Sequence, residues 1–253
     1  MNLINRVNPK LRKYIEESIF PLYDLNGPSH GIKHIKEVIE RSFQIIEEYE
    51  KNEKNPVKIN YDLAYIIAAY HDIGDHIDRK KHHIISGEIM FEDNNLDEFI
   101  SPEEKITARE AIEDHRASNK NLPRSIYGRI VLTADRNDNL QNFFVRRINF
   151  CLEHHPEYSK EQVIREIYDS TFKKFGKDGY ANEKPGYMPS RKLNEYFETL
   201  HRLIEDKEEF HRLSELYYEA VTRSQKQLDS IKVKESNIHK LEIPMKKERN
   251  LDE

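Results

Sequence analysis

The chain has 253 residues, of which 37% are hydrophobic and 34% charged, so it can bury a core beneath a heavily charged surface. Its formal net charge is −5 and no basic tract stands out, which argues against duplex DNA or RNA as a partner. A single cysteine, Cys151, excludes an internal disulfide, and no stretch has the apolar character of a signal peptide or a membrane span. We therefore expect a cytoplasmic protein, whose oligomeric state the sequence does not indicate.

The composition and the periodicity of the chain favour helices. Glycine is scarce, with 8 residues, and apolar side chains recur at helical spacing over long stretches. We find no internal repeat and no convincing pair of strands. The sequence therefore predicts an all-α fold.

Start and stop signals divide the first part of the chain into three helices. Asn8-Pro9 opens a helix that runs to about Phe20, and a loop follows over residues 22–28. Ser29 is expected to cap a helix over residues 31–49, whose apolar stripe consists of Ile35, Val38, Ile39, Ser42, Ile45 and Ile46. Asn60 is expected to cap the third, which carries the apolar run 63–70 and ends near Gly74, where we expect a positive φ.

The second part of the chain shows further helix signals. Capping boxes at Ser101–Glu104 and Ser159–Gln162 predict helices that reach about Ser118 and Phe175. The remaining predicted helices cover residues 79–94, residues 124–144 or beyond (one helix or two pieces around 137–139), and residues 190–223 or further as one or two helices. Residues 176–189 predict a long loop, either a lid over a site or an exposed connection.

A change of composition near Pro156 suggests two parts. We expect a helical, metal-binding domain over residues 1–155 and a helical extension over residues 156–253 that packs on it, with a flexible tail from about residue 232.

Four side chains of metal-ligand type are predicted to face inward. His71 and Asp72 end the apolar run, where a buried polar pair is costly unless it finds a partner. His34 lies one turn before Val38, and Asp135 follows an apolar helix over residues 129–134. A divalent metal would be such a partner. The alternative is that these are hydrogen-bonded polar residues at helix ends.

This ordered pattern, together with its flanking residues 29–38 and 68–74, resembles the HD-domain metal-dependent phosphohydrolases over roughly residues 23–147. The resemblance implies an all-helical core around a divalent metal, without distinguishing Mn, Mg, Fe, Co, Ni and Zn. It also implies that the metal activates water for attack on a phosphate. The ligands that it implies are His34, His71, Asp72 and Asp135.

Some HD subfamilies carry further histidines in the two helices after the His-Asp doublet. They include the cyclic-dinucleotide phosphodiesterases and the small nucleotide pyrophosphohydrolase-like proteins. The resemblance points to His82, rather than His83, and to His115, as ligands of a second metal or as phosphate contacts. Arg116 follows His115 where the cyclic-dinucleotide subfamily has a second His and then a Glu, and this departure argues against that substrate.

Other residues near the expected ligands have several interpretations. Asp75 follows the doublet and is either an orienting or general-acid group or a solvated loop residue. Lys81 and Arg136 adjoin expected ligands and are candidates for binding substrate phosphate. His30, four residues before His34, is a supporting residue, a capping residue or a ligand.

The leading hypothesis is a phosphohydrolase that acts on an ester or anhydride of a small nucleotide or phosphorylated metabolite. The second is an HD-fold diiron oxygenase, in which His82 and His115 supply the extra ligands. The third is a non-catalytic module that binds a nucleotide as a signal.

Overall fold

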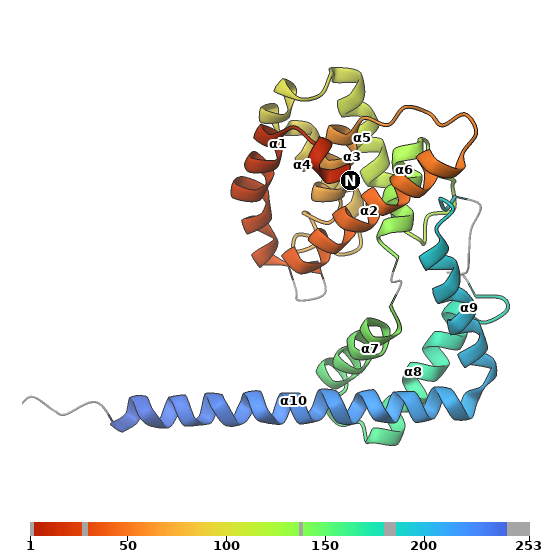
Figure 1. The fold of residues 1–253 in the computed structure, drawn as a ribbon. Coiled ribbons are helices and arrows are strands. Elements are labelled where there is room, and N and C mark those ends of the chain that lie inside the picture. Colours follow the sequence, from red (N-terminus) through yellow and green to blue (C-terminus); the bar gives the residue numbers. More distant parts are fainter. Residues whose placement is uncertain (1–2, 27–29, 137–138, 180–185, 242–253) are drawn as a thin grey trace, which may run out of the picture. The chain divides into compact units, whose positions relative to one another are not determined.

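The computed structural model describes residues 3–26, 30–136, 139–179 and 186–241, with side chains as far as residue 224. Every regular element in these ranges is a helix, which confirms the predicted all-α fold (Figure 1). The chain divides into two compact units: Met1–Leu140 with Thr171–Glu205, and Gln141–Ser170 with Asp206–Glu253. The predicted domains, residues 1–155 and 156–253, remain a prediction, because compactness alone does not define a folding domain.

The first unit is built around α3 (Tyr61–Tyr70), in which every residue from Leu63 to Tyr70 is buried. A helix that is apolar on all sides belongs inside a core, and α3 packs against α2, α5 and α6. The other α-helices that lie wholly within this unit among the described residues are α1 (Pro9–Tyr14), α2 (Ile32–Asn52), α4 (His82–Glu92), α5 (Pro102–Asp114), α6 (Ile126–Ala134) and α9 (Arg191–Glu205).

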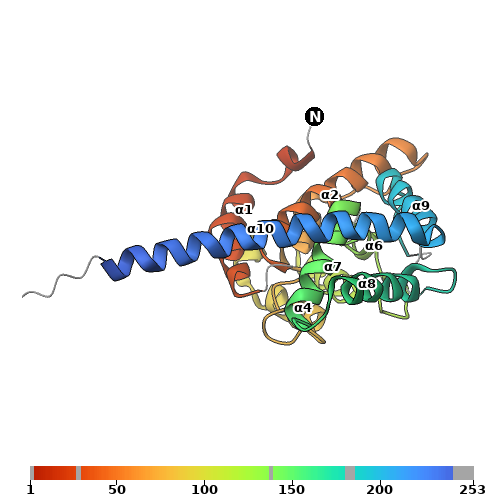
Figure 2. The same cartoon turned by 90° about the horizontal axis from the view of Figure 1, so that it is seen from below.

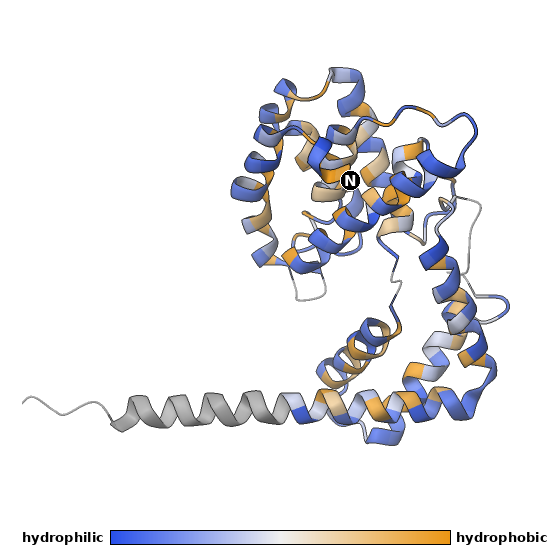
Figure 3. Cartoon of the chain, in the orientation of Figure 1, coloured by the Kyte–Doolittle hydropathy of each residue, from blue (hydrophilic) through white to orange (hydrophobic). Residues whose placement is uncertain are grey.

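In contrast to α3, α2 buries one face only. Its predicted apolar stripe, from Ile35 to Ile46, is buried, while its other face is hydrophilic (Figure 3). The helix begins after Gly31 without a side-chain cap, and the predicted cap, Ser29, lies outside the described residues.

The predicted helix starts at Asn60 and Ser101 are confirmed in detail. The Asn60 side chain accepts hydrogen bonds from the backbone N–H groups of Asp62 and Leu63. Ser101 and Glu104 form the complete capping box at the start of α5.

Several predicted boundaries are wrong. The first helix does not continue regularly to Phe20: α1 ends at Tyr14, a π-helical turn covers Ile15–Ile19, and a 3-10 helix covers Phe20–Leu25. Pro21 fits this 3-10 helix because the first turn of a helix needs no hydrogen bond from its N–H groups. Much of the predicted loop over residues 22–28 is therefore helical.

The helix predicted from Arg79 begins only at His82, because the Asp78 side chain accepts from the N–H groups of Lys80 and Lys81 and forms a turn there. The helix predicted to reach Ser118 ends at Asp114, whose carboxylate binds Arg124 from the next segment.

Gly74 does not adopt the predicted positive φ, which no glycine in the described ranges has. It is needed for space: a Cβ there would lie 2.8 Å from Cγ2 of Ile85 and 3.1 Å from the N atom of Ser86. Gly74 thus lets the start of α4 approach the His71-Asp72 doublet, and its own N–H donates to Ser86 Oγ at 3.0 Å.

The second unit contains α7 (Leu140–His154), most of α8 (Lys160–Phe175) and α10 (Lys207–Leu241), which is one long helix in both views (Figures 1 and 2). Phe144 is fully buried in it, against the rings of Phe210 and Tyr217. Within the predicted flexible tail, residues 232–241 belong to α10 and residues 242–253 lie outside the described residues. No described helix is long and apolar enough to cross a membrane.

Candidate metal centre

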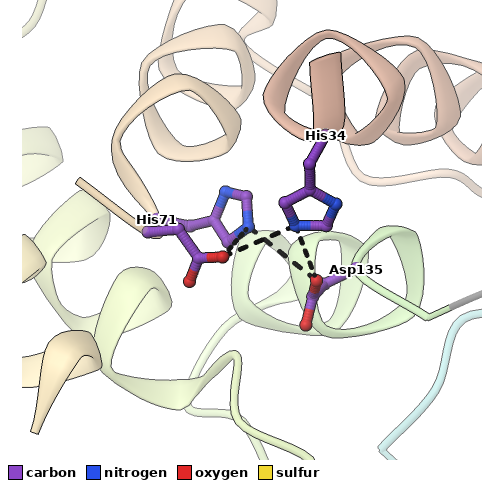
Figure 4. A group of neighbouring side chains, drawn as sticks. His34, His71 and Asp135 are labelled. Carbon is purple, nitrogen blue, oxygen red and sulfur yellow. Dashed lines mark ion pairs between the residues drawn. The ribbon is translucent and has the colours of Figure 1, made fainter. Parts of the chain in front are cut away.

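Three helix ends bring the predicted ligands together. His34 lies in the first turn of α2, His71 caps the C-terminus of α3 with Asp72 directly after it, and Asp135 caps the C-terminus of α6. His71 and Asp72 are fully enclosed, His34 is buried and Asp135 is half-buried. These four side chains, which are up to about 100 residues apart in the sequence, therefore lie around one point in the first unit (Figure 4).

The ligand atoms of this first group face one another. His34 Nε2 lies 3.2 Å from Asp135 Oδ1 and 3.5 Å from Asp72 Oδ2. His71 Nε2 lies 3.5 Å from Asp72 Oδ2 and 3.9 Å from Asp135 Oδ1. Ligand atoms at about 2.0–2.2 Å from a common cation are separated by roughly 3–3.6 Å, so three of these four distances fit a shared divalent metal and that of 3.9 Å is slightly longer.

The protonation pattern supports the same conclusion. His71 Nδ1 donates to the carbonyl of Ala68 at 2.9 Å, which leaves its Nε2 as the basic nitrogen. Nε2 of His71 and Nε2 of His34 are both buried and make no hydrogen bond within the described ranges. Buried basic nitrogens that face carboxylate oxygens need a cation or a proton between them. The residues thus fit a divalent metal by donor type, spacing and unmet bonding.

A second group lies on the other side of Asp72. Its Oδ1 is 3.3 Å from His82 Nε2 and 3.4 Å from His115 Nε2, and these two nitrogens are 3.1 Å apart. His82 Nδ1 donates to the carbonyl of Arg79 at 2.8 Å, and His115 Nδ1 donates to that of Ile112 at 2.6 Å. Both Nε2 atoms are therefore available as ligands, and they converge on Asp72.

The charges of the two groups shift the pKa values of their members. Burial alone would raise the pKa of Asp72, but His71 and the other surrounding imidazoles outweigh it and hold the pKa well below its usual range. Burial alone would also raise the pKa of Asp135, but Arg136 and His34 outweigh this effect, and the pKa is lowered. For His34, burial would lower the pKa, but Asp135 and Asp72 raise it to about 9.

Residues around the doublet fix its position. His30 Nδ1 lies 2.7 Å from Asp72 Oδ2, so His30 supports Asp72 directly, and its Nε2 lies 3.4 Å from an Arg79 nitrogen. Asn26 is buried and donates from Nδ2 to the carbonyls of Asp72, at 2.9 Å, and His30, at 3.1 Å. Its Oδ1 accepts from the backbone N–H of His76 at 3.0 Å. We did not predict the role of Asn26 from the sequence.

The remaining predicted site residues differ in their placement. Asp75 is buried, and its Oδ1 lacks a hydrogen bond in the described part of the chain although it lies 4.0 Å from His82 Nδ1. Arg136 forms an ion pair with Asp135 and donates to the carbonyl of Leu132. Lys81 is exposed, one residue before α4.

Tyr187 is a further residue near the first group that the sequence did not indicate. It is 6% exposed, and its hydroxyl has no hydrogen-bond partner among the described residues. Burial raises the pKa of this phenol; the charge of Arg136 opposes the shift and that of Asp135 adds to it. A buried hydroxyl without a hydrogen bond, close to those two charges, is a candidate for contact with a bound substrate.

Comparison with known protein families gives a match for the first unit. Residues 31–140 match the family model of the HD domain. Searches of curated proteins and of solved structures found no match. The matched segment contains both ligand groups, whereas Tyr187 lies outside it.

Proposed function

Because residues 31–140 place this chain in the HD-domain superfamily of metal-dependent phosphohydrolases, we propose that it hydrolyses a phosphate ester or anhydride of a small nucleotide or related phosphorylated metabolite. The observation that carries the proposal is the position of Asp72. Its two carboxylate oxygens face two separate groups of imidazole nitrogens, which is an arrangement suited to holding cations side by side.

The first group, His34, His71, Asp72 and Asp135, would hold one divalent metal. A metal in such a site lowers the pKa of bound water and offsets the negative charge of a phosphoryl oxygen. For His82 and His115, a second metal is favoured over a phosphate contact. Two Nε2 atoms only 3.1 Å apart can share a cation. Donation from both to a phosphate would instead require two adjacent imidazolium groups, because both Nδ1–H groups are already bonded to backbone carbonyls.

Other residues of this chain have expected parts in the reaction. Asp75 would accept or donate a proton, because it is buried close to His82 and its Oδ1 has no hydrogen-bond partner among the described residues. Arg136 holds Asp135 in place and adds positive charge next to the expected position of the phosphate, and Lys81 remains a candidate for a longer-range contact.

A test needs the metal-loaded protein and a panel of nucleotides, sugar phosphates and other phosphomonoesters. Each of His71→Ala and Asp72→Ala should lower kcat/KM by more than the roughly 100-fold that supporting residues around a metal typically cost. His154→Ala, at an exposed position in the second unit, is the matched control and should change nothing. Unchanged activity in both site variants, or no hydrolysis of any panel member, would refute the proposal.

The two adjacent groups also support a second candidate, a diiron oxygenase, since imidazole and carboxylate ligands suit iron equally well. This function requires oxygen consumption coupled to turnover in the iron-loaded protein. Hydrolysis that proceeds at full rate with Mn²⁺ or Mg²⁺ under anaerobic conditions would exclude it.

A further inference from the structure

A pocket of about 690 Å³ is lined by both chain neighbours of His115, and the chemistry described so far does not use it. We call it the loop pocket. Its apolar lining consists of Ala117, Leu122, Pro123, Leu132 and Gly186. Its volume lies within the roughly 300–1,000 Å³ that small-molecule sites in proteins occupy.

The loop pocket is joined to both ligand groups through the chain. Asp114 and Arg116 line it and are the two neighbours of His115. Adjacent Cα atoms are about 3.8 Å apart, so the pocket begins next to a residue of the second group. Leu132, on another wall, is one turn before Asp135 and accepts from Arg136 through its carbonyl.

The walls of the loop pocket are held in place before any ligand binds. Arg124 donates to both carboxylate oxygens of Asp114, at 3.0 to 3.2 Å, and to Glu113 Oε2 at 2.7 Å. At the other end of the loop, Arg116 donates to the carbonyl of Lys80 at 2.5 Å. A binding site that is already formed avoids the entropic cost of ordering a loop on binding.

Gly186 belongs to the wall supplied by the distant segment. Arg129 donates to its carbonyl at 3.3 Å and to that of Tyr187 at 3.0 Å, which fixes the segment on α6. A Cβ at Gly186 would lie 2.9 Å from Pro123 Cδ and 3.5 Å from Cδ atoms of Leu122 and Leu132. The absence of a side chain at this position thus lets the segment pack closely against three residues of the lining.

The lining defines the chemistry of the occupant. Apolar walls suit a ring, and the amides and hydroxyl of Ser118, Asn119 and Asn121 suit polar atoms at the edge of that ring. Arg116 and Lys120 add positive charge, whereas the only carboxylate of the lining, Asp114, is already neutralised by Arg124. The occupant should therefore be a heteroaromatic ring that carries an anionic group.

We propose that the loop pocket binds the base of a nucleotide whose phosphate lies at the two ligand groups. The inference rests on the proposed function and narrows it, because sugar phosphates and inorganic phosphates would leave the apolar walls uncovered. Leu122, which is 62% exposed beside the pocket, would be covered by the base on binding.

The test compares binding of nucleoside 5′-monophosphates and of inorganic phosphate to the metal-loaded full chain by titration calorimetry. Leu122→Asp should weaken nucleotide binding at least tenfold. Leu122→Asn, which adds no charge, should weaken it severalfold and leave phosphate binding within twofold. Leu216→Asp is the matched control, because Leu216 is 56% exposed on α10, and it should change neither affinity. Exposed positions are chosen so that the variants fold.

The outcomes separate this inference from the proposed function. The proposed role of the loop pocket would be refuted, even if nucleotides are hydrolysed, by either of two results. The first is an affinity for nucleotides that stays within twofold in both Leu122 variants, and the second is an affinity that weakens no more than the affinity for phosphate. Binding that depends on the base and on Leu122, without hydrolysis, would support the pocket and refute the phosphohydrolase. Binding of phosphate but of no nucleotide would overturn the inference.

Discussion

Raising the pH should tighten metal binding at the first group, because the metal and a proton compete for Nε2 of His34. In the metal-free protein this nitrogen lies 3.2 Å from Asp135 Oδ1 and 3.5 Å from Asp72 Oδ2, and the two carboxylates raise the pKa of His34 to about 9 against the effect of burial. A bound metal would take the same lone pair, so the proton must leave first.

The size of the effect follows from this pKa. At pH 7, a group with a pKa of about 9 is about 99% protonated, and its deprotonation costs about 2.7 kcal/mol. The apparent Kd for the metal should therefore fall about tenfold per pH unit between pH 7 and 9, and level off above that range. Close to one proton should leave His34 for each metal bound at pH 7.

The stability of the metal-free protein should change in the opposite direction. A histidine whose pKa is higher in the folded state contributes stability that is complete below its ordinary value of about 6.5 and is lost as the pH rises through about 9. The free energy of unfolding of the metal-free protein should thus decrease by up to about 3 kcal/mol over this range.

Titration calorimetry with Mn²⁺ between pH 6.5 and 8.0, in buffers of different ionisation enthalpy, counts the released protons. His34→Asn should bind the metal more weakly and release about one proton less, whereas His154→Gln should behave as the unchanged protein. If the affinity is independent of pH, or if His34→Asn releases as many protons as the unchanged protein, then His34 does not hold the competing proton and the reasoning is wrong.

Three other substitutions have defined expected results. Tyr187→Phe should lower kcat about tenfold. It should leave the free energy of unfolding unchanged or raise it by up to about 1 kcal/mol, because the hydroxyl has no hydrogen bond to lose among the described residues. A loss of stability in urea unfolding would contradict this. Asp93→Ala should lower the free energy of unfolding by about 1–3 kcal/mol, because the Tyr70 hydroxyl loses its acceptor. This loss should be smaller at low pH, since the pKa of Asp93 is lowered in the folded state. An unchanged melting temperature at neutral pH would argue against it. Gly74→Ala should weaken metal binding by the second group first, because the added methyl group pushes the start of α4, and His82 with it, away; equal weakening of both groups would be inconsistent with this explanation.

Features that depend on neighbouring residues could be predicted from the sequence. Asn60 and Ser101 signal helix starts because a cap bonds to N–H groups within the next three residues. The convergence of His34, His71 and Asp135 could be predicted because each is a polar residue beside an apolar helical run, where a partner is needed.

Features that depend on distant contacts could not be predicted in this way. Asn26 supports Asp72 across 46 residues, and Tyr187 lies near Asp135 through a segment that shows no regular pattern. The sequence predicts a positive φ at Gly74, but the glycine is instead required by the closeness of Ile85, which only the packing of α4 defines. Helix ends were misplaced for a similar reason, since the contact between Asp114 and Arg124 joins two separate segments.

The hydrogen bond from the backbone N–H of Met188 to Thr133 Oγ1, at 2.8 Å, attaches a stretch outside the HD match to the helix that carries Asp135. Thr133 is buried, and Gly186 and Tyr187 are secured beside it by Arg129. Under the functions proposed above, the segment 186–188 would add one wall to a substrate site whose metal ligands and other walls lie within the HD match. Mutations over residues 186–188 could then redirect the enzyme to a new nucleotide while its metal ligands stay the same.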